Sequence, residues 1–97
     1  MELHEAYTQR RQAELDEYDA EIKTIEVKST LVPPDEQMQF YADLQTLRAQ
    51  HAKMQQKLGE LRESNGHRWT DLKEELETAW KDLQNGMQRA DQSVKAG

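Results

Sequence analysis

The chain has 97 residues, 33% of which are charged, with a net charge of −6 and no cysteine. Its length predicts a single helical domain, residues 1–97, with a small core, and the lack of cysteine excludes disulfides and thiolate chemistry. The acidic balance disfavours nucleic acid and anionic lipid as partners, because both attract basic patches.

Only two prolines and four glycines interrupt the chain, a composition that favours long helices or coiled coil. The first ten residues, MELHEAYTQR, lack the apolar core of a signal peptide, and no stretch is long enough to span a bilayer. We therefore expect a cytoplasmic location and no stable insertion into a membrane.

The first predicted element is a helix over residues 2–31. Its apolar positions are spaced alternately three and four residues apart, with Ser29 in the series: Leu15, Tyr18, Ile22, Ile25 and Val32. This spacing is typical of a heptad seam. Pro33 ends the helix because a proline disfavours helical geometry in the residue before it, and Pro34 suits the start of the next helix.

The second predicted helix covers residues 35–64 and repeats the heptad spacing: Phe40, Leu44, Leu47, His51, Met54, Leu58 and Leu61. It ends at the sequence SNG, residues 64–66, where Asn–Gly is a turn signal. This break is weaker than the two prolines, so the alternative is that the second and third helices continue as one long helix.

The two heptad helices are expected to form a hairpin with Ile22 opposite Leu47. The other layers along the seam are then Ile25–Leu44, Tyr18–His51, Leu15–Met54, Arg11–Leu58 and Thr8–Leu61. Four flanking pairs have opposite charges in this register: Glu5–Arg62, Glu14–Lys57, Asp19–Arg48 and Lys28–Asp43. Exposed pairs contribute only ~0.2–1 kcal/mol each, so they select the register while burial of the seam stabilises the fold.

The layer of Tyr18 and His51 is polar. We interpret it as a polar core layer that fixes the register; the other reading is a ligand site or a proton switch at His51.

The third predicted helix covers residues 67–95 and contains an eleven-residue repeat, in which Trp69 corresponds to Trp80. One stripe along it contains Trp69, Leu72, Leu76, Trp80, Leu83, Met87, Ala90 and Val94. Eleven residues make three turns at ~3.67 residues per turn, so the repeat keeps these side chains on one face. The stripe is either ordinary core or an exposed interaction stripe for a protein or a lipid surface. Gly86 lowers the helix propensity by ~1 kcal/mol relative to Ala, so we expect the end of this helix to fray.

A second candidate packing face recurs every seven residues on the first helix, away from its seam: Ala6, Ala13, Ala20 and Val27. These residues either reflect plain helix propensity or allow another helix, such as that of another subunit, to approach closely.

Three segments of similar length with two short turns predict an all-α fold, an antiparallel three-helix up-down-up bundle built on a coiled-coil hairpin. Trp80 is then expected near the layer of Tyr18 and His51. Trp69 is expected at the end of the bundle beside Leu58 and Leu61.

No pattern indicates catalysis, and we predict no enzyme, no cofactor and no metal site. HEAYT, residues 4–8, begins like a zincin helix, but Thr8 stands where the second histidine is needed. His67 is expected near His4 at one end of the bundle, without the carboxylates of a di-iron site. The many acidic residues are most simply a solvated face.

Two stretches, QAELDEYDAEI and KLGELRESNGHRWTDLKEELETAWKDL, resemble a family of small bacterial coiled-coil proteins associated with stress response. The similarity covers most of residues 10–90 and is strongest over residues 57–84. The chain differs from that family at Pro33–Pro34 and at His67–Arg68. The resemblance implies a soluble helical protein without catalytic residues.

The leading hypothesis is a non-enzymatic helical coiled-coil interaction protein, related to stress through the resemblance, that binds an unknown protein partner or self-associates. The alternative is reversible binding to a lipid surface or an amphipathic cargo through the Trp and Leu stripe of the third helix. Its weakness is that this helix has no basic polar face.

Overall fold

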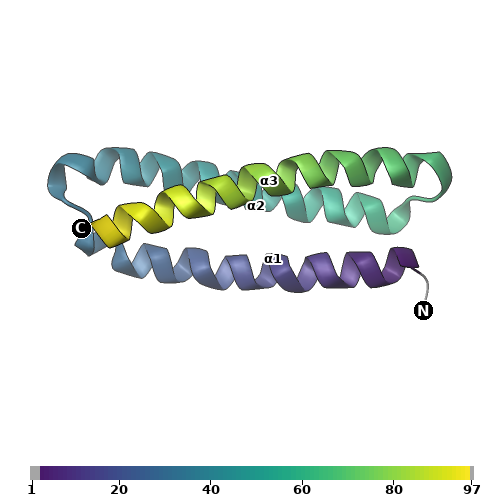
Figure 1. The fold of residues 1–97 in the computed structure, drawn as a ribbon, viewed down its shortest axis with the longest axis horizontal. Helices are drawn as coiled ribbons and strands as arrows, with labels where there is room; N and C mark the ends of the chain where they lie inside the picture. Colours follow the sequence, from purple (N-terminus) through teal and green to yellow (C-terminus); the bar gives the residue numbers. More distant parts are fainter. Residues whose placement is uncertain (1–2, 97) are drawn as a thin grey trace.

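The computed structural model describes residues 3–96, which form an all-α bundle of three antiparallel helices (Figure 1). Helix α1 spans Leu3–Val27, α2 spans Gln37–Glu63 and α3 spans Gly66–Ala96. The bundle is a rod with extents of 50 × 21 × 15 Å. The predicted fold class is confirmed; the predicted start of the first helix at residue 2 lies outside the described residues. Along the described chain, no helix is both long and apolar enough to cross a membrane.

The connection between α1 and α2 is longer than the sequence predicted, because it contains two 3₁₀ turns. The first α-helix ends at Val27 and is followed by a 3₁₀ turn over Lys28–Leu31, not by α-helix as far as residue 31. Val32 is extended, with ψ 130°, because Pro33 disfavours the helical region there. A second 3₁₀ turn, Pro34–Glu36, then leads into α2.

The connection between α2 and α3 is a true turn. Ser64 is extended and its hydroxyl donates to the carbonyl of Leu61 at 2.8 Å. Gly66 has φ +63°, a left-handed conformation that favours glycine. The alternative of one continuous helix through this region is therefore wrong.

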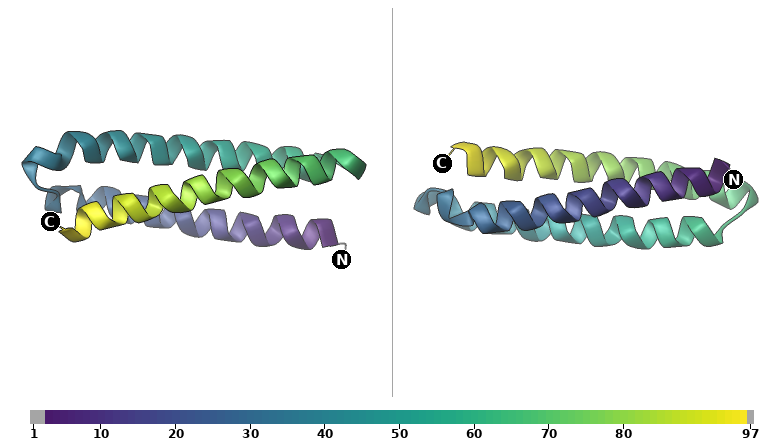
Figure 2. Two further views of the ribbon diagram at one scale, coloured as in Figure 1. Left: turned by 45° about the horizontal axis from the view of Figure 1, so that its top comes forward. Right: turned by 90° about the horizontal axis from the view of Figure 1, so that it is seen from below.

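The core follows the predicted seams. The side chains that are 0% exposed come from all three helices: Leu15, Leu47, Met54, Leu58, Leu61, Leu76, Leu83 and Ala90. Helices α2 and α3 pack most closely, whereas α1 lies closer to α2 than to α3. Figure 2 shows α3 running obliquely across the other two helices. Long side chains therefore make much of the contact between α1 and α3.

Gly86 lies where α3 approaches α2. A Cβ atom at this position would be 2.8 Å from Oε1 of Gln50 and 3.3 Å from Cδ1 of Leu47. That Oε1 atom is buried and has no hydrogen-bond partner among the described residues. The expected fraying does not follow from Gly86, since α3 continues as helix to Ala96. The glycine instead allows the close approach.

The hairpin contacts agree with the predicted register. The side-chain amides of Gln12 and Gln55 donate to each other at 3.0 and 2.9 Å. His51 Nε2 lies 3.0 Å from the backbone oxygen of Leu15, one turn from the residue predicted to lie opposite. These contacts cross the seam on both sides of the predicted Leu15–Met54 layer.

The predicted flanking charge pairs are not the ones that form. Arg48 pairs with Glu26, Lys57 pairs with Glu75 of α3 at 3.6 Å, and Arg62 donates to Gln12 at 3.1 Å. The prediction considered only the hairpin, whereas α3 supplies further carboxylates. Long exposed side chains can reach several partners at similar free energy.

Candidate functional site

The candidate interaction stripe of α3 is part of the core. Trp80 is 5% exposed and Trp69 is 9% exposed. The other members are also buried: Leu72, Leu76, Leu83, Met87, Ala90 and Val94. In the closed bundle the stripe therefore faces α1 and α2 and offers little surface to a partner.

Trp80 lies in the middle of the bundle against α1. The Tyr18 ring stacks on it, with centroids 5.1 Å apart and an interplanar angle of 24°. The guanidinium of Arg11 lies 4.7 Å from the indole centroid, close enough for a cation–π interaction. The predicted neighbourhood of Trp80 and Tyr18 is present.

The two residues of the polar core layer have separate partners. Tyr18 is half-buried and stacks on Trp80, while half-buried His51 bonds to the Leu15 carbonyl. Because a carbonyl oxygen only accepts, Nε2 of His51 carries the hydrogen. Each contact links α1 to another helix and so restricts the register from two sides.

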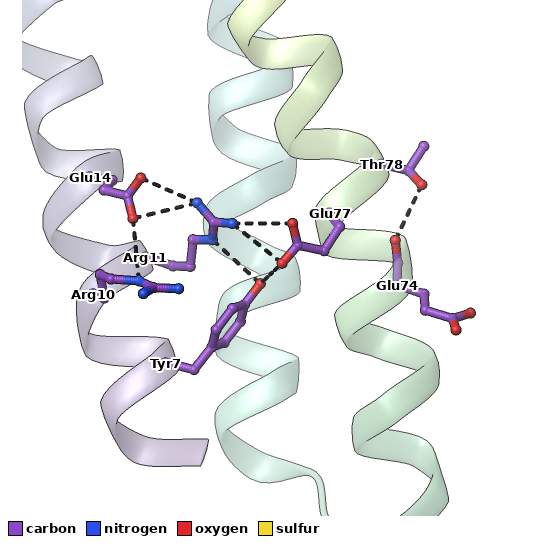
Figure 3. A network of polar contacts seen from close by, with 7 residues as sticks. All are labelled: Tyr7, Arg10, Arg11, Glu14, Glu74, Glu77 and Thr78. Atoms are coloured by element: carbon purple, nitrogen blue, oxygen red, sulfur yellow. Dashed lines mark hydrogen bonds and ion pairs between the residues drawn. The ribbon is translucent and has the colours of Figure 1, made fainter. Parts of the chain in front are cut away.

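A charged network joins α1 to α3 near Trp80 (Figure 3). Arg11 donates from Nη2 to the Glu77 carboxylate at 3.1 Å and from Nη1 to the Glu14 carboxylate at 3.2 Å. The Tyr7 hydroxyl donates to Glu77, and Arg11 Nε approaches the Tyr7 oxygen at 3.4 Å. Figure 3 shows the guanidinium between the two carboxylates, with Tyr7 directed at the same acid of α3.

The network shifts the pKa values of its members. Burial acts to raise the pKa of Glu77, but the hydrogen bond from Tyr7 and the charge of Arg11 outweigh it and the pKa is lowered. Burial raises the pKa of Tyr7, and its hydrogen bond to Glu77 adds to that effect. Burial opposes the charge of Arg11, yet Tyr7 and the two carboxylates raise its pKa. Near neutral pH the network is therefore an ion pair with a protonated tyrosine.

Sequence reasoning placed Arg11 in the seam but missed this network. The available signal was a charged residue at an otherwise apolar heptad position, which requires a partner if it is buried. Its partner Glu77 lies on α3, and the heptad pattern of the hairpin does not reveal how α3 faces α1.

The candidate second packing face is open. Ala6, Ala13, Ala20 and Val27 are all exposed on α1. No described helix packs on them, so this face is available for a helix outside the bundle, but small residues alone do not identify one.

Four larger apolar side chains are exposed around the prolines at one end of the rod. Val27 is 80% exposed, Leu31 54%, Met38 88% and Tyr41 49%. We refer to these four residues as the end patch. A cleft of about 410 Å³ begins beside Tyr41, and its lining includes Leu44, Glu26 and Arg48.

Trp69 lies at the opposite end of the rod. The His4 ring stacks on the indole at 3.9 Å with an interplanar angle of 11°, and Tyr7 meets it edge-on at 5.8 Å. A cleft at this end is lined by both Trp69 and Leu61, the neighbour that the sequence predicted. His67 is exposed in the first turn of α3.

The described residues contain no group of three or more His, Asp or Glu side chains placed to hold a metal ion. The Arg11 network has its charges directed at one another, which suits a structural link between helices. Comparison with protein-family models, with curated proteins and with solved structures gave no match for this chain.

Proposed function

We propose that this chain is a non-enzymatic helical interaction protein that self-associates through the end patch. The observation that carries the proposal is the exposure of Val27, Leu31, Met38 and Tyr41 around one turn. Single exposed apolar residues are ordinary, but several gathered together indicate an interaction surface. Among the described residues, the other large apolar side chains are buried or half-buried, with the exception of Leu3 at the opposite end of the rod.

A second copy suits this surface because the end patch is uncharged and its surroundings carry both signs. Lys28 is exposed at this end, as are Asp35 and Glu36. A two-fold contact places the same patch on both sides of the interface. Lys28 of one copy can then approach an acid of the other while the apolar side chains meet.

Sedimentation equilibrium at several concentrations tests the proposal. We expect the parent to associate as its concentration rises, and Met38→Ser with Tyr41→Ser to weaken the association. The matched control is Ala13→Ser with Ala20→Ser on the second packing face, which should associate like the parent. A parent that remains monomeric throughout, or an effect confined to the alanine variants, would contradict the proposal.

The alternative of binding to a lipid surface through the α3 stripe requires that Trp69 and Trp80 leave the core. Their burial counts against this reading for the closed bundle. Flotation with liposomes tests it, since co-flotation that depends on both indoles would favour the alternative.

The proposed relation to stress and the proposed cytoplasmic location rest on sequence alone, chiefly the resemblance over residues 57–84. Measuring the amount of the protein before and after heat, oxidative or osmotic stress tests the first. Unchanged levels under all three would remove it.

A further inference from the structure

We propose that the cleft between the N-terminal ends of α1 and α3 binds a small single-chain amphipathic anion, such as a medium-chain carboxylate. The cleft has a volume of about 570 Å³, within the range of small-molecule sites. It lies at the end of the rod opposite the end patch. The inference therefore goes beyond the proposed function and does not depend on it.

One part of this cleft is apolar. Its apolar lining comprises Leu3, Ala6, Tyr7 and Trp69. The stacking of His4 and the edge contact of Tyr7 hold the Trp69 indole in place. Leu3 is largely exposed, so an alkyl chain against the indole could also cover this side chain and remove apolar surface from water.

The other part of the cleft is basic. Lys73 and Arg10 line it, together with His4. The Lys73 ammonium lies 4.9 Å from the Tyr7 centroid and 5.4 Å from the Trp69 centroid. The Arg10 guanidinium lies 5.8 Å from the Tyr7 centroid. Two cations therefore lie beside the apolar surface, as an anionic head group with an apolar tail requires.

No carboxylate lines this cleft, although the protein has a net charge of −6. Four other clefts on the described residues each include acidic residues: Glu21 and Asp91, Glu5, Asp43 and Asp82, and Glu26. The basic and apolar lining is thus a local departure from the acidic surface. It favours an anion over a cation or a neutral ligand of the same shape.

Two acids that contact residues of this cleft already have other partners. Glu77 accepts hydrogen bonds from Tyr7 and Arg11, and Glu14 accepts from Arg11. The remaining pair of Arg10 with Glu14 spans 3.8 Å at the surface, where such pairs contribute little. Arg10 and Lys73 can therefore turn towards a bound head group without leaving a buried acid unpaired.

The full chain can be titrated with decanoate, kept below its critical micelle concentration, while the indole N–H signals are followed by NMR. Trp69→Phe assigns the two signals. We expect a saturable shift of the Trp69 signal and little change at Trp80. Decyltrimethylammonium, which has the same chain length and the opposite charge, should give no saturable shift.

Charge variants decide whether the cations matter. Lys73→Gln and Arg10→Gln should each weaken decanoate binding by roughly two- to fivefold, the range for a surface ion pair. Lys81→Gln removes the same charge from an exposed position on the same helix and should leave binding unchanged. Circular dichroism melting of each variant tests whether the fold is retained.

Three results would overturn the proposal: no saturable shift, equal binding of the cationic amphiphile, or equal weakening by Lys81→Gln. Binding seen only with anionic vesicles would also overturn it and would assign the surface to membranes. The variant with Met38→Ser and Tyr41→Ser, which tests the proposed function, should bind decanoate like the parent. Failure of one proposal is therefore distinguishable from failure of the other.

Discussion

Arg11 places a largely buried charge between α1 and α3. Its side chain is only 14% exposed, and a guanidinium taken out of water loses favourable hydration. Carboxylates from two helices and the Trp80 face offset this loss. Removing one partner of a buried ion pair costs more free energy than the intact pair contributes to stability. A shift of α1 that separated Arg11 from Glu77 would therefore be unfavourable, and the network holds α1 in one position against α3.

The lowered pKa of Glu77 predicts a pH dependence of stability. Since the folded-state pKa lies below the unfolded value of roughly 4.3, the carboxylate contributes stability that is complete above that pH and is lost as pH falls through the folded pKa. Glu77→Gln should therefore be less stable than the parent at neutral pH and lose less stability between about pH 6 and about pH 3.

Melting temperatures across that pH range provide the measurement. The control is Glu74→Gln, which removes an exposed acid from the same helix and should follow the parent curve. A constant difference between Glu77→Gln and the parent at every pH would show that the carboxylate charge contributes nothing.

The two tryptophans should differ in their contribution to stability. Trp80 lies at mid-bundle and Trp69 near an end, and Trp80 is slightly better buried. Truncating a large buried side chain typically costs ~3–5 kcal/mol, so we expect that range for Trp80→Ala and a smaller loss for Trp69→Ala. Urea unfolding measures both changes.

Acrylamide quenching of the single-tryptophan variants Trp69→Phe and Trp80→Phe provides an independent check. Both remaining indoles should be protected. Free quenching of both in a folded protein would mean that the stripe is not core and would favour α3 as a binding element.

At the scale of the helices, α2 and α3 form the closest pair. Substitution of Gly86 tests how tightly these two helices pack. Alanine gains ~1 kcal/mol of helix propensity over glycine, but its Cβ would crowd Gln50 and Leu47. We expect Gly86→Ala to stabilise the Gln50→Ala background more than the parent, with a coupling of about 0.5–1 kcal/mol. The free energies of unfolding of the parent, the two single variants and the double variant give the coupling. If the effects of the two substitutions are additive, Gly86 is not tightly packed against Gln50.

The helices were predictable because each carries one clear pattern: two heptad seams and one eleven-residue repeat. The turn at Pro33 was predictable because proline restricts the residue before it. The Arg11–Glu77 contact was not predictable. Heptad spacing shows which face of a helix lies in a seam, but it does not show which residue of α3 lies opposite a charged residue of α1. The role of Gly86 was not predictable either, because it depends on how closely α3 approaches α2, and no local sequence pattern shows this.

At the scale of the whole molecule, we expect the two prolines to make the chain fold back between α1 and α2. Val32, just before them, is extended and buried. Replacing Pro33 and Pro34 with Ala should let α1 continue into α2, giving a longer rod and domain-swapped dimers. Sedimentation velocity measures both shape and mass.

The matched control for this change is Pro34→Ala alone. Pro33 then still restricts Val32, so the variant should keep the size and shape of the parent. A double variant that also keeps the parent's size would show that core packing, not proline, imposes the turn.

The odd number of helices has a mechanical consequence. Helix α1 begins at Leu3 and α3 ends at Ala96, and these two helix ends lie at opposite ends of a rod 50 Å long (Figure 1). Tension applied between these two residues would act along the helix axes, so the seams would be loaded in shear and all their layers would resist together. In a bundle with an even number of antiparallel helices, both ends emerge on one side, and the same tension would peel the helices apart one layer at a time.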